Sequence, residues 1–87
     1  MDITKTYNTE EFNQAYILSV LQEVSVILNE KGYNSINQIV GYLMSGDPGY
    51  ITSYKDARTK LLSIERAKII EALVKENVSL WDIWDSI

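Results

Sequence analysis

The chain contains no cysteine and no histidine among its 87 residues. Without cysteine it can form neither a disulfide framework nor a thiolate metal site, and a zinc site built from carboxylates alone would be uncommon. Without histidine it also lacks the usual base that activates a serine or threonine nucleophile. We therefore assign no catalytic residue and no metal ligand, expect no cofactor, and predict that the chain is not an enzyme.

Basic residues are also few, with 8 lysines and arginines against 12 acidic residues and a net charge of −4. They are scattered along the chain and form no stripe that could follow a phosphate backbone, which disfavours nucleic-acid binding. The same balance repels an anionic membrane surface. No apolar run approaches the ~20 residues needed to span a bilayer, and residues 1–5 lack the apolar segment of a signal peptide. We expect a cytoplasmic protein without direct membrane contact.

Apolar residues make up 46% of the chain, which is ample for a folded globule. A chain of this length forms one domain, and such a domain buries only about 60–65% of its unfolded surface. Its core is therefore thin, and small domains of this kind often complete their core by self-association. This is the first reason to expect an oligomer.

The first predicted helix follows a polar tail that spans residues 1–8. Asn8 and Glu11 have the spacing of a capping box, so the helix is expected to begin near Asn8 or Thr9. Gly32 can adopt the left-handed conformation that ends a helix. Between these signals, apolar residues recur at helical spacing: Ile17, Val20, Leu21, Val24, Ile27 and Leu28.

The second predicted helix runs from Asn34 or Ser35, which can supply the cap, to Gly46, which can end it. Five of its apolar residues share one helix face at i, i+3, i+4, i+7 and i+8. Gly41 lies inside this helix, at a cost of about 1 kcal/mol relative to alanine. Either a neighbour packs closely on it, or the helix tolerates one glycine. We favour close packing, with the neighbour left open. The residues expected in dimer or core packing are Ile36, Ile39, Val40, Gly41, Leu43 and Met44.

The second half of the chain is less determined. Residues 53–77 form either one helix or two, with Ser63 as a candidate cap for a second helix. Residues 79–87 are expected to form a turn or short helix that holds both tryptophans. Trp81 and Trp84 either cover the domain's own core or anchor another subunit, since tryptophan is enriched at interface hot spots.

Together these patterns predict an all-α fold. We expect a small compact domain of three to five helices over residues 9–87, preceded by the 1–8 tail.

A long central segment resembles the IreB family of small bacterial regulatory proteins. It reads EKGYNSINQIVGYLMSGDPGYIT over residues 30–52 and is followed by YKDAR over residues 54–58. Looser similarity continues through residues 62–66 and 71–74. Ser35 stands where the family usually has proline, and the tryptophan-containing end differs from the basic, tyrosine-rich ending of the family.

The resemblance implies a homodimer, intertwined or tightly packed, that regulates resistance to cell-wall antibiotics without catalysing a reaction. It also implies two partners, a transmembrane Ser/Thr kinase of the PASTA type and the cognate phosphatase. In the family the kinase modifies N-terminal threonines, and Thr4 and Thr6 occupy the equivalent region here, by position and not by motif. Two alternatives remain: a structural or housekeeping subunit without phosphoregulation, and a nucleic-acid accessory protein, which the charge balance disfavours.

Overall fold

The computed structural model describes residues 9–85 of the chain, with the side chains of residues 13–78. Four α-helices and no strand occur in this part: α1 (Thr9–Glu30), α2 (Ser35–Ser45), α3 (Ala57–Leu62) and α4 (Arg66–Asp85). Two short 3-10 turns, η2 (Pro48–Tyr50) and η3 (Tyr54–Asp56), connect α2 to α3. The all-helical prediction is confirmed for these residues.

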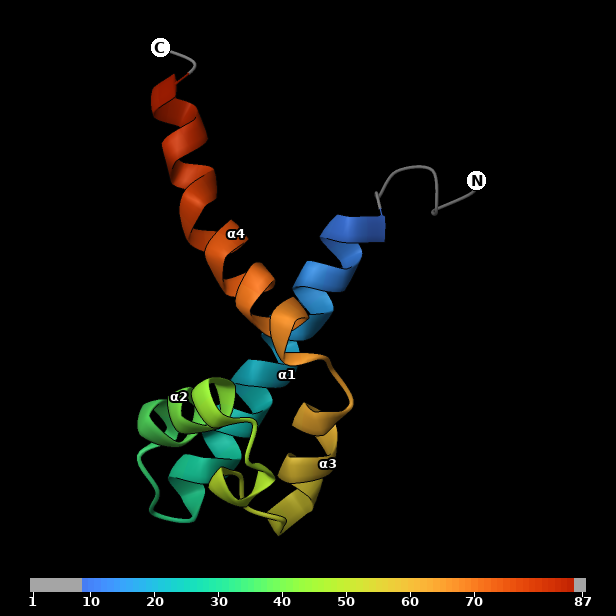
Figure 1. Cartoon of the computed structure of the whole chain (residues 1–87), viewed down its shortest axis with the longest axis vertical. Coiled ribbons are helices and arrows are strands. Elements are labelled where there is room, and N and C mark those ends of the chain that lie inside the picture. The colour runs from blue at the N-terminus through green and yellow to red at the C-terminus, as the bar shows by residue number, and fades with distance from the viewer. Residues whose placement is uncertain (1–8, 86–87) are drawn as a thin grey trace.

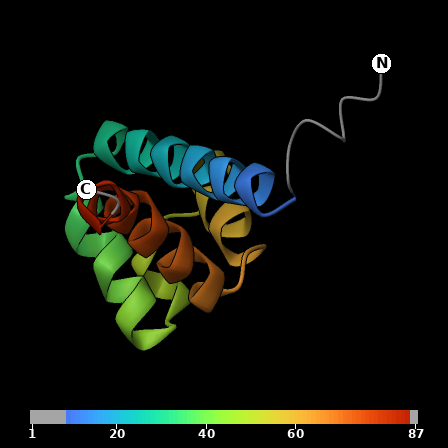
Figure 2. The same cartoon turned by 90° about the horizontal axis from the view of Figure 1, so that it is seen from above.

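Helix α1 is the central element, because α2, α3 and α4 all contact it. In Figure 2 it lies along one edge, with the other three helices to the same side of it. Figure 1 shows α2 and α3 flanking its second half, while α4 diverges from its first half as the other arm of a V. The helix ends where predicted, since Gly32 has φ +85° and the Tyr33 N–H donates to the Leu28 carbonyl at 3.0 Å.

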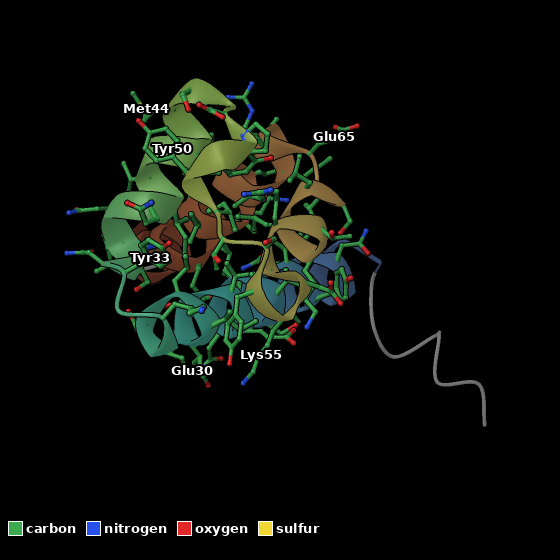
Figure 3. The ribbon with its side chains drawn as sticks, turned by 90° about the horizontal axis from the view of Figure 1, so that it is seen from below. Glu30, Tyr33, Met44, Tyr50, Lys55 and Glu65 are labelled. Atoms are coloured by element: carbon green, nitrogen blue, oxygen red, sulfur yellow. The ribbon has the colours of Figure 1, made fainter. Side chains whose placement is uncertain are left out.

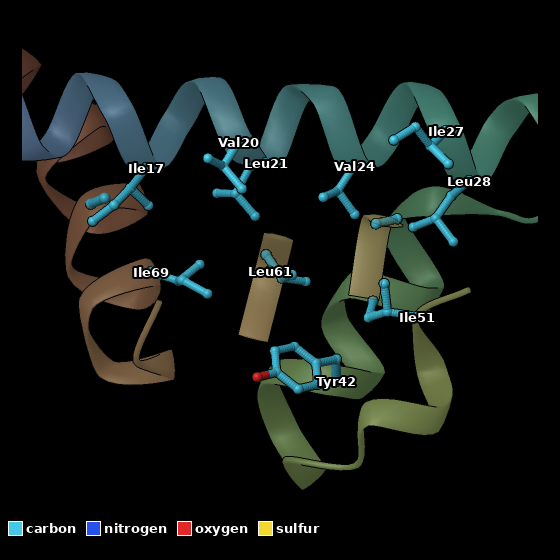
Figure 4. Close-up of a cluster of buried hydrophobic side chains, with 12 residues drawn as sticks. Ile17, Val20, Leu21, Val24, Ile27, Leu28, Tyr42, Ile51, Leu61 and Ile69 are labelled. Carbon is cyan, nitrogen blue, oxygen red and sulfur yellow. The ribbon is translucent and has the colours of Figure 1, made fainter. Parts of the chain in front are cut away.

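The buried side of α1 carries the residues that its periodicity predicts. In Figure 4 they point toward α3, the start of α4, α2 and the loop after α2. The other members of the core come from those elements, so one continuous apolar cluster holds all four helices together. The buried apolar residues are Ile17, Val20, Leu21, Val24, Ile27, Leu28, Tyr42, Ile51, Ala57, Leu61, Ile69 and Ala72.

Helix α2 has the two ends that the sequence predicts. The Asn34 carboxamide oxygen accepts a hydrogen bond from the Asn37 N–H at 3.1 Å. Gly46 has φ +75°, and its N–H donates to the Tyr42 carbonyl at 2.7 Å. Both ends are fixed by contacts within a few residues, which is why local sequence could locate them.

Residues 53–77 form two helices, with the break at residues 63–65. Ser63 ends α3 and does not cap α4: its N–H donates to the Thr59 carbonyl at 3.1 Å, and its hydroxyl donates to the Lys60 carbonyl at 2.6 Å. Helix α3 is short, because it begins at Ala57, directly after η3, and ends at Leu62. Residues 79–85 are the last turns of α4 and not a separate element.

Candidate functional site

Three features bear on the kind of site that the described residues can form: a cluster that could hold a metal, a helix that could span a membrane, and an unpaired buried polar atom. Within residues 9–85 no group of three histidine, cysteine or acidic side chains could hold a metal ion. None of the helices in that range is long and apolar enough to cross a bilayer. The side chains described include no buried polar atom without a hydrogen-bond partner that could mark a ligand site. The candidate sites are therefore surfaces.

The first surface is the outer face of α2, formed by Ile36, Val40 and Met44. These side chains are 72%, 51% and 81% exposed and follow one another at i, i+4 and i+8. Tyr33 and Tyr50 flank them, and both are also exposed. Figure 3 labels Met44, Tyr50 and Tyr33 along the α2 side of the molecule. A continuous exposed apolar row on a small domain typically marks an interaction site.

The row is exposed because α2 docks through a neighbouring face. Tyr42 is almost fully buried, and Ser35 is buried with its hydroxyl 3.0 Å from that of Ser25 on α1. Ile39 and Leu43 are partly buried against the core. The sequence predicted that all five apolar residues of α2 at helical spacing pack on one face. In the structure the face that contacts the core is centred on Tyr42, so only Ile39 and Leu43 of the five contact the core, and the other three are exposed.

Gly41 is covered by the ring of Tyr50. A Cβ at position 41 would lie 2.6 Å from Cδ1 of that ring, far inside van der Waals contact. The side-chain amide of Gln38 also donates to the Tyr50 carbonyl at 2.9 Å, which holds the η2 turn against α2. The expected close packing at Gly41 is thus with a side chain of the same chain.

Two arginines fix the end of α2 and the loop after it. Arg66, at the start of α4, donates from Nη1 to the Leu43 carbonyl at 3.1 Å. Arg58 donates from Nε to the carbonyls of Ile51 at 2.8 Å and Pro48 at 3.1 Å. Because these guanidinium groups satisfy carbonyls left open at a helix end and in a loop, α2 is held in one orientation.

The turn before α3 is held against the end of α1. Lys55 and Asp56 have φ of 50° and 61°, a conformation that non-glycine residues rarely adopt. Lys55 Nζ lies 2.9 Å from Glu30, and both Lys31 and Lys55 lie over the ring of Tyr54. The hydrogen bond to Glu30, assisted by the charge of its carboxylate, raises the pKa of Lys55. These contacts stabilise the turn at Lys55 and Asp56 despite its unfavourable backbone conformation.

A second surface lies between the arms of the V. A cleft of about 250 Å³ separates α1 from α4, lined by Tyr16 and Ile17 on one side and Ala72 on the other. The Gln14 amide bridges the arms by donating to Glu76 at 3.2 Å.

On the α4 wall of this cleft, Glu71 lies between Lys75 at 2.9 Å and Lys68 at 3.6 Å. The Lys75 hydrogen bond, with a contribution from the Lys68 charge, lowers the pKa of Glu71. The carboxylate of Glu71 thus offsets one of the two lysine charges on this wall.

Helix α4 also carries an apolar row on its solvent side. Ile70, Val74 and Val78 are about half exposed and follow at i, i+4 and i+8. The core-facing residues Ile69 and Ala72 lie on a different face of the same helix. A helix with apolar residues on two faces normally packs on both sides.

Some predicted site residues lie outside what the structure describes. Thr4 and Thr6 precede the described residues, and the side chains of Trp81 and Trp84 lie beyond the described ones.

The structure also adds packing residues that the sequence did not predict. Tyr42 and Tyr50 were not identified as packing residues of α2. Nor was Arg66, whose contact with α2 spans 23 positions and leaves no local signal.

The surfaces described above suit a protein that acts by recognition, and a comparison with known families points the same way. The model of a family described as the IreB regulatory phosphoprotein matches residues 2–79. The match covers most of the chain, takes in α1, α2, α3 and α4 as far as residue 79, and extends to Thr4 and Thr6. This chain therefore belongs to the IreB family of regulatory phosphoproteins.

Proposed function

We propose that this chain is a non-enzymatic, homodimeric regulatory protein controlled by phosphorylation of Thr4 or Thr6. The kinase would be a transmembrane Ser/Thr kinase of the PASTA type, opposed by its cognate phosphatase, in cytoplasmic signalling that sets resistance to cell-wall antibiotics. The observation that carries the proposal is the family match, because a regulatory phosphoprotein model extends over both threonines. The absence of cysteine and histidine supports a role without catalysis.

A phosphate on residues 1–8 is expected to act by changing the surface charge of the protein, and not by changing its fold. It adds about −1.5 to −2 charge at pH 7 to a chain whose net charge is already −4. Glu10 and Glu11 lie in the first turn of α1, a few residues later, and their charges oppose a further negative group there. The phosphate is therefore expected to act on a partner surface and to leave the four-helix core intact.

Phosphorylation is expected to fall on Thr4 or Thr6 when the purified chain is incubated with the PASTA-type kinase and ATP. Thr9 and Thr59 belong to α1 and α3, and the Thr52 hydroxyl accepts a hydrogen bond from the Tyr54 N–H, so these three are held in folded structure. Tandem mass spectrometry locates the phosphate. Thr4→Ala together with Thr6→Ala should abolish labelling, while Thr59→Ala should not.

Labelling at Thr59, or no labelling at all, would contradict the proposed phosphoregulation. A stable but unmodified dimer would instead favour the alternative of a structural or housekeeping subunit.

The apolar row of α4 supports the dimer. A two-fold axis would bring Ile70, Val74 and Val78 of one copy against the same residues of another, since a symmetric dimer uses one self-complementary patch. In Figure 1 the second half of α4 projects away from α2 and α3, so a second helix could pack along it. The tryptophans at 81 and 84 extend this arm in sequence and are proposed interface anchors.

Val74→Glu is expected to weaken the dimer by at least about tenfold, because a carboxylate would be buried in an apolar interface without a partner. Sedimentation should then show a larger share of the 10.0 kDa monomer at micromolar concentration. Gln22→Glu adds the same charge at an exposed position of α1 and should leave the dimer unchanged. If both variants sediment like the parent chain, the α4 row is not the interface.

A further inference from the structure

Lys68 and Lys75 line the cleft between α1 and α4 and belong neither to the core nor to the α4 row. We infer that this cleft is the docking site for the N-terminal segment of the same chain, residues 1–8, once Thr4 or Thr6 is phosphorylated. The phosphate lies between the two lysines, and the docked segment covers the walls of the cleft. The inference rests on the proposed phosphorylation, because it states where the modified segment binds.

The described side chains that line the cleft carry more positive than negative charge. Lys68 and Lys75 contribute two positive charges, and Glu71, which contacts them at 3.6 and 2.9 Å, offsets one. Glu76 accepts a hydrogen bond from Gln14 and lines a different hollow. A phosphate between the two ammonium groups gains a charge-assisted hydrogen bond from each. An unmodified threonine hydroxyl carries no charge, so docking depends on the modification.

The cleft is also where the first half of α1 meets basic side chains. The other basic side chains described contact the second half of α1, the end of α2 or the loops after it: Lys31, Lys55, Arg58, Lys60 and Arg66. Glu10 and Glu11 oppose a phosphate at the first turn of α1. A phosphate on the preceding segment is therefore drawn past that turn, to the lysines of the cleft.

The N-terminal segment is long enough to reach the cleft. Helix α1 begins at Thr9, and Asn13 lines the cleft, which places it about 6 Å farther along the helix axis. An extended chain covers about 3.3–3.6 Å per residue, which gives about 10 Å between Thr6 and Thr9 and about 17 Å between Thr4 and Thr9. Both lengths exceed the axial distance to Asn13, so a chain that turns back before α1 brings either phosphate to the cleft.

Lys75 lies at the same end of the cleft as Asn13, since the adjacent Glu76 accepts a hydrogen bond from Gln14. A phosphate tethered by so few residues has an effective concentration of about millimolar at this site. Two surface lysines can therefore hold it, although they would bind free phosphate weakly. The same tether favours docking within one copy over docking in a second copy.

Amide NMR spectra of the full-length chain test the inference, with phosphothreonine incorporated at position 4 or at position 6 during translation. The phosphate at either position should shift the amide signals of Tyr16 and Ala72, which lie on the two walls of the cleft. The signal of Val40, on the outer face of α2, should stay in place. Because no kinase is used, the result does not depend on which kinase modifies the chain.

Lys68→Gln together with Lys75→Gln should reduce these shifts by at least about threefold, because both charge-assisted hydrogen bonds are lost. Lys31→Gln together with Lys60→Gln removes the same charge outside the cleft and should leave the shifts unchanged. Docking in a second copy is tested with a labelled Thr4→Ala, Thr6→Ala chain. After subunit exchange with the unlabelled phosphorylated chain, the cleft signals of this labelled chain should not move.

Four results would overturn the inference: no shift at the cleft on phosphorylation, undiminished shifts in the Lys68, Lys75 variant, an equal reduction in the Lys31, Lys60 variant, or shifts in the labelled unphosphorylated chain. Kinase labelling of Thr4 or Thr6 is measured separately on the unmodified chain. Failure of that labelling contradicts the proposed function, whereas failure of the NMR test contradicts only the docking.

Discussion

Leu61→Ala is expected to lower the free energy of unfolding by about 2–5 kcal/mol, the range for removing a buried leucine side chain from a packed core. Leu61 is completely buried, between α1 and the elements that contact it. Because a domain of this size has a thin core, a loss of this magnitude is a large share of its total stability. Urea or guanidinium denaturation followed by circular dichroism measures the change.

The adjacent residue provides the control for this prediction. Leu62 lies on the same short helix and is 45% exposed, so Leu62→Ala should change the free energy of unfolding by no more than about 0.5 kcal/mol. The two variants share helix propensity and composition, and only burial distinguishes them. Both must be measured at one protein concentration, because self-association of the kind proposed would add to apparent stability. Equal losses in the two variants would contradict the placement of α3.

Gly41→Ala is expected to destabilise the chain by about 1–3 kcal/mol, the usual cost of forcing extra atoms into a packed site. The added Cβ would lie 2.6 Å from one ring carbon of Tyr50 and 2.9 Å from another, so the ring must leave its position on α2. At an exposed helix site the same change would be favourable, because alanine exceeds glycine in helix propensity by about 1 kcal/mol. Denaturant unfolding measures both the sign and the size of the change in the free energy of unfolding.

The decisive control is the same substitution in a chain that already carries Tyr50→Ala. With the ring removed, Gly41→Ala should become neutral or stabilising, by up to about 1 kcal/mol. Asn37→Ala, at an exposed position of α2, should be near neutral in both backgrounds. A penalty that persists without Tyr50 would mean that something other than this ring covers Gly41, such as a second molecule.

The surfaces were less predictable than the helices that carry them. The aliphatic pattern of α2 identified a packing helix, yet it did not separate Ile39 and Leu43, which contact the core, from the three exposed residues. Likewise, the pattern over residues 53–77 left open one helix or two. The break depends on Ser63 bonding backward to α3 and on Arg66 reaching α2, and the second of these contacts crosses more than twenty residues.

The sequence by itself determined the helical fold class, both ends of α2 and the end of α1. The helix ends depend on capping and on glycine conformation, which act within one helical turn. Only the tertiary structure decided which side of α2 faces the core. That choice follows from the fit of Tyr42, Ser35 and Tyr50 between separate elements, and packing of this kind has no signature within one helical turn.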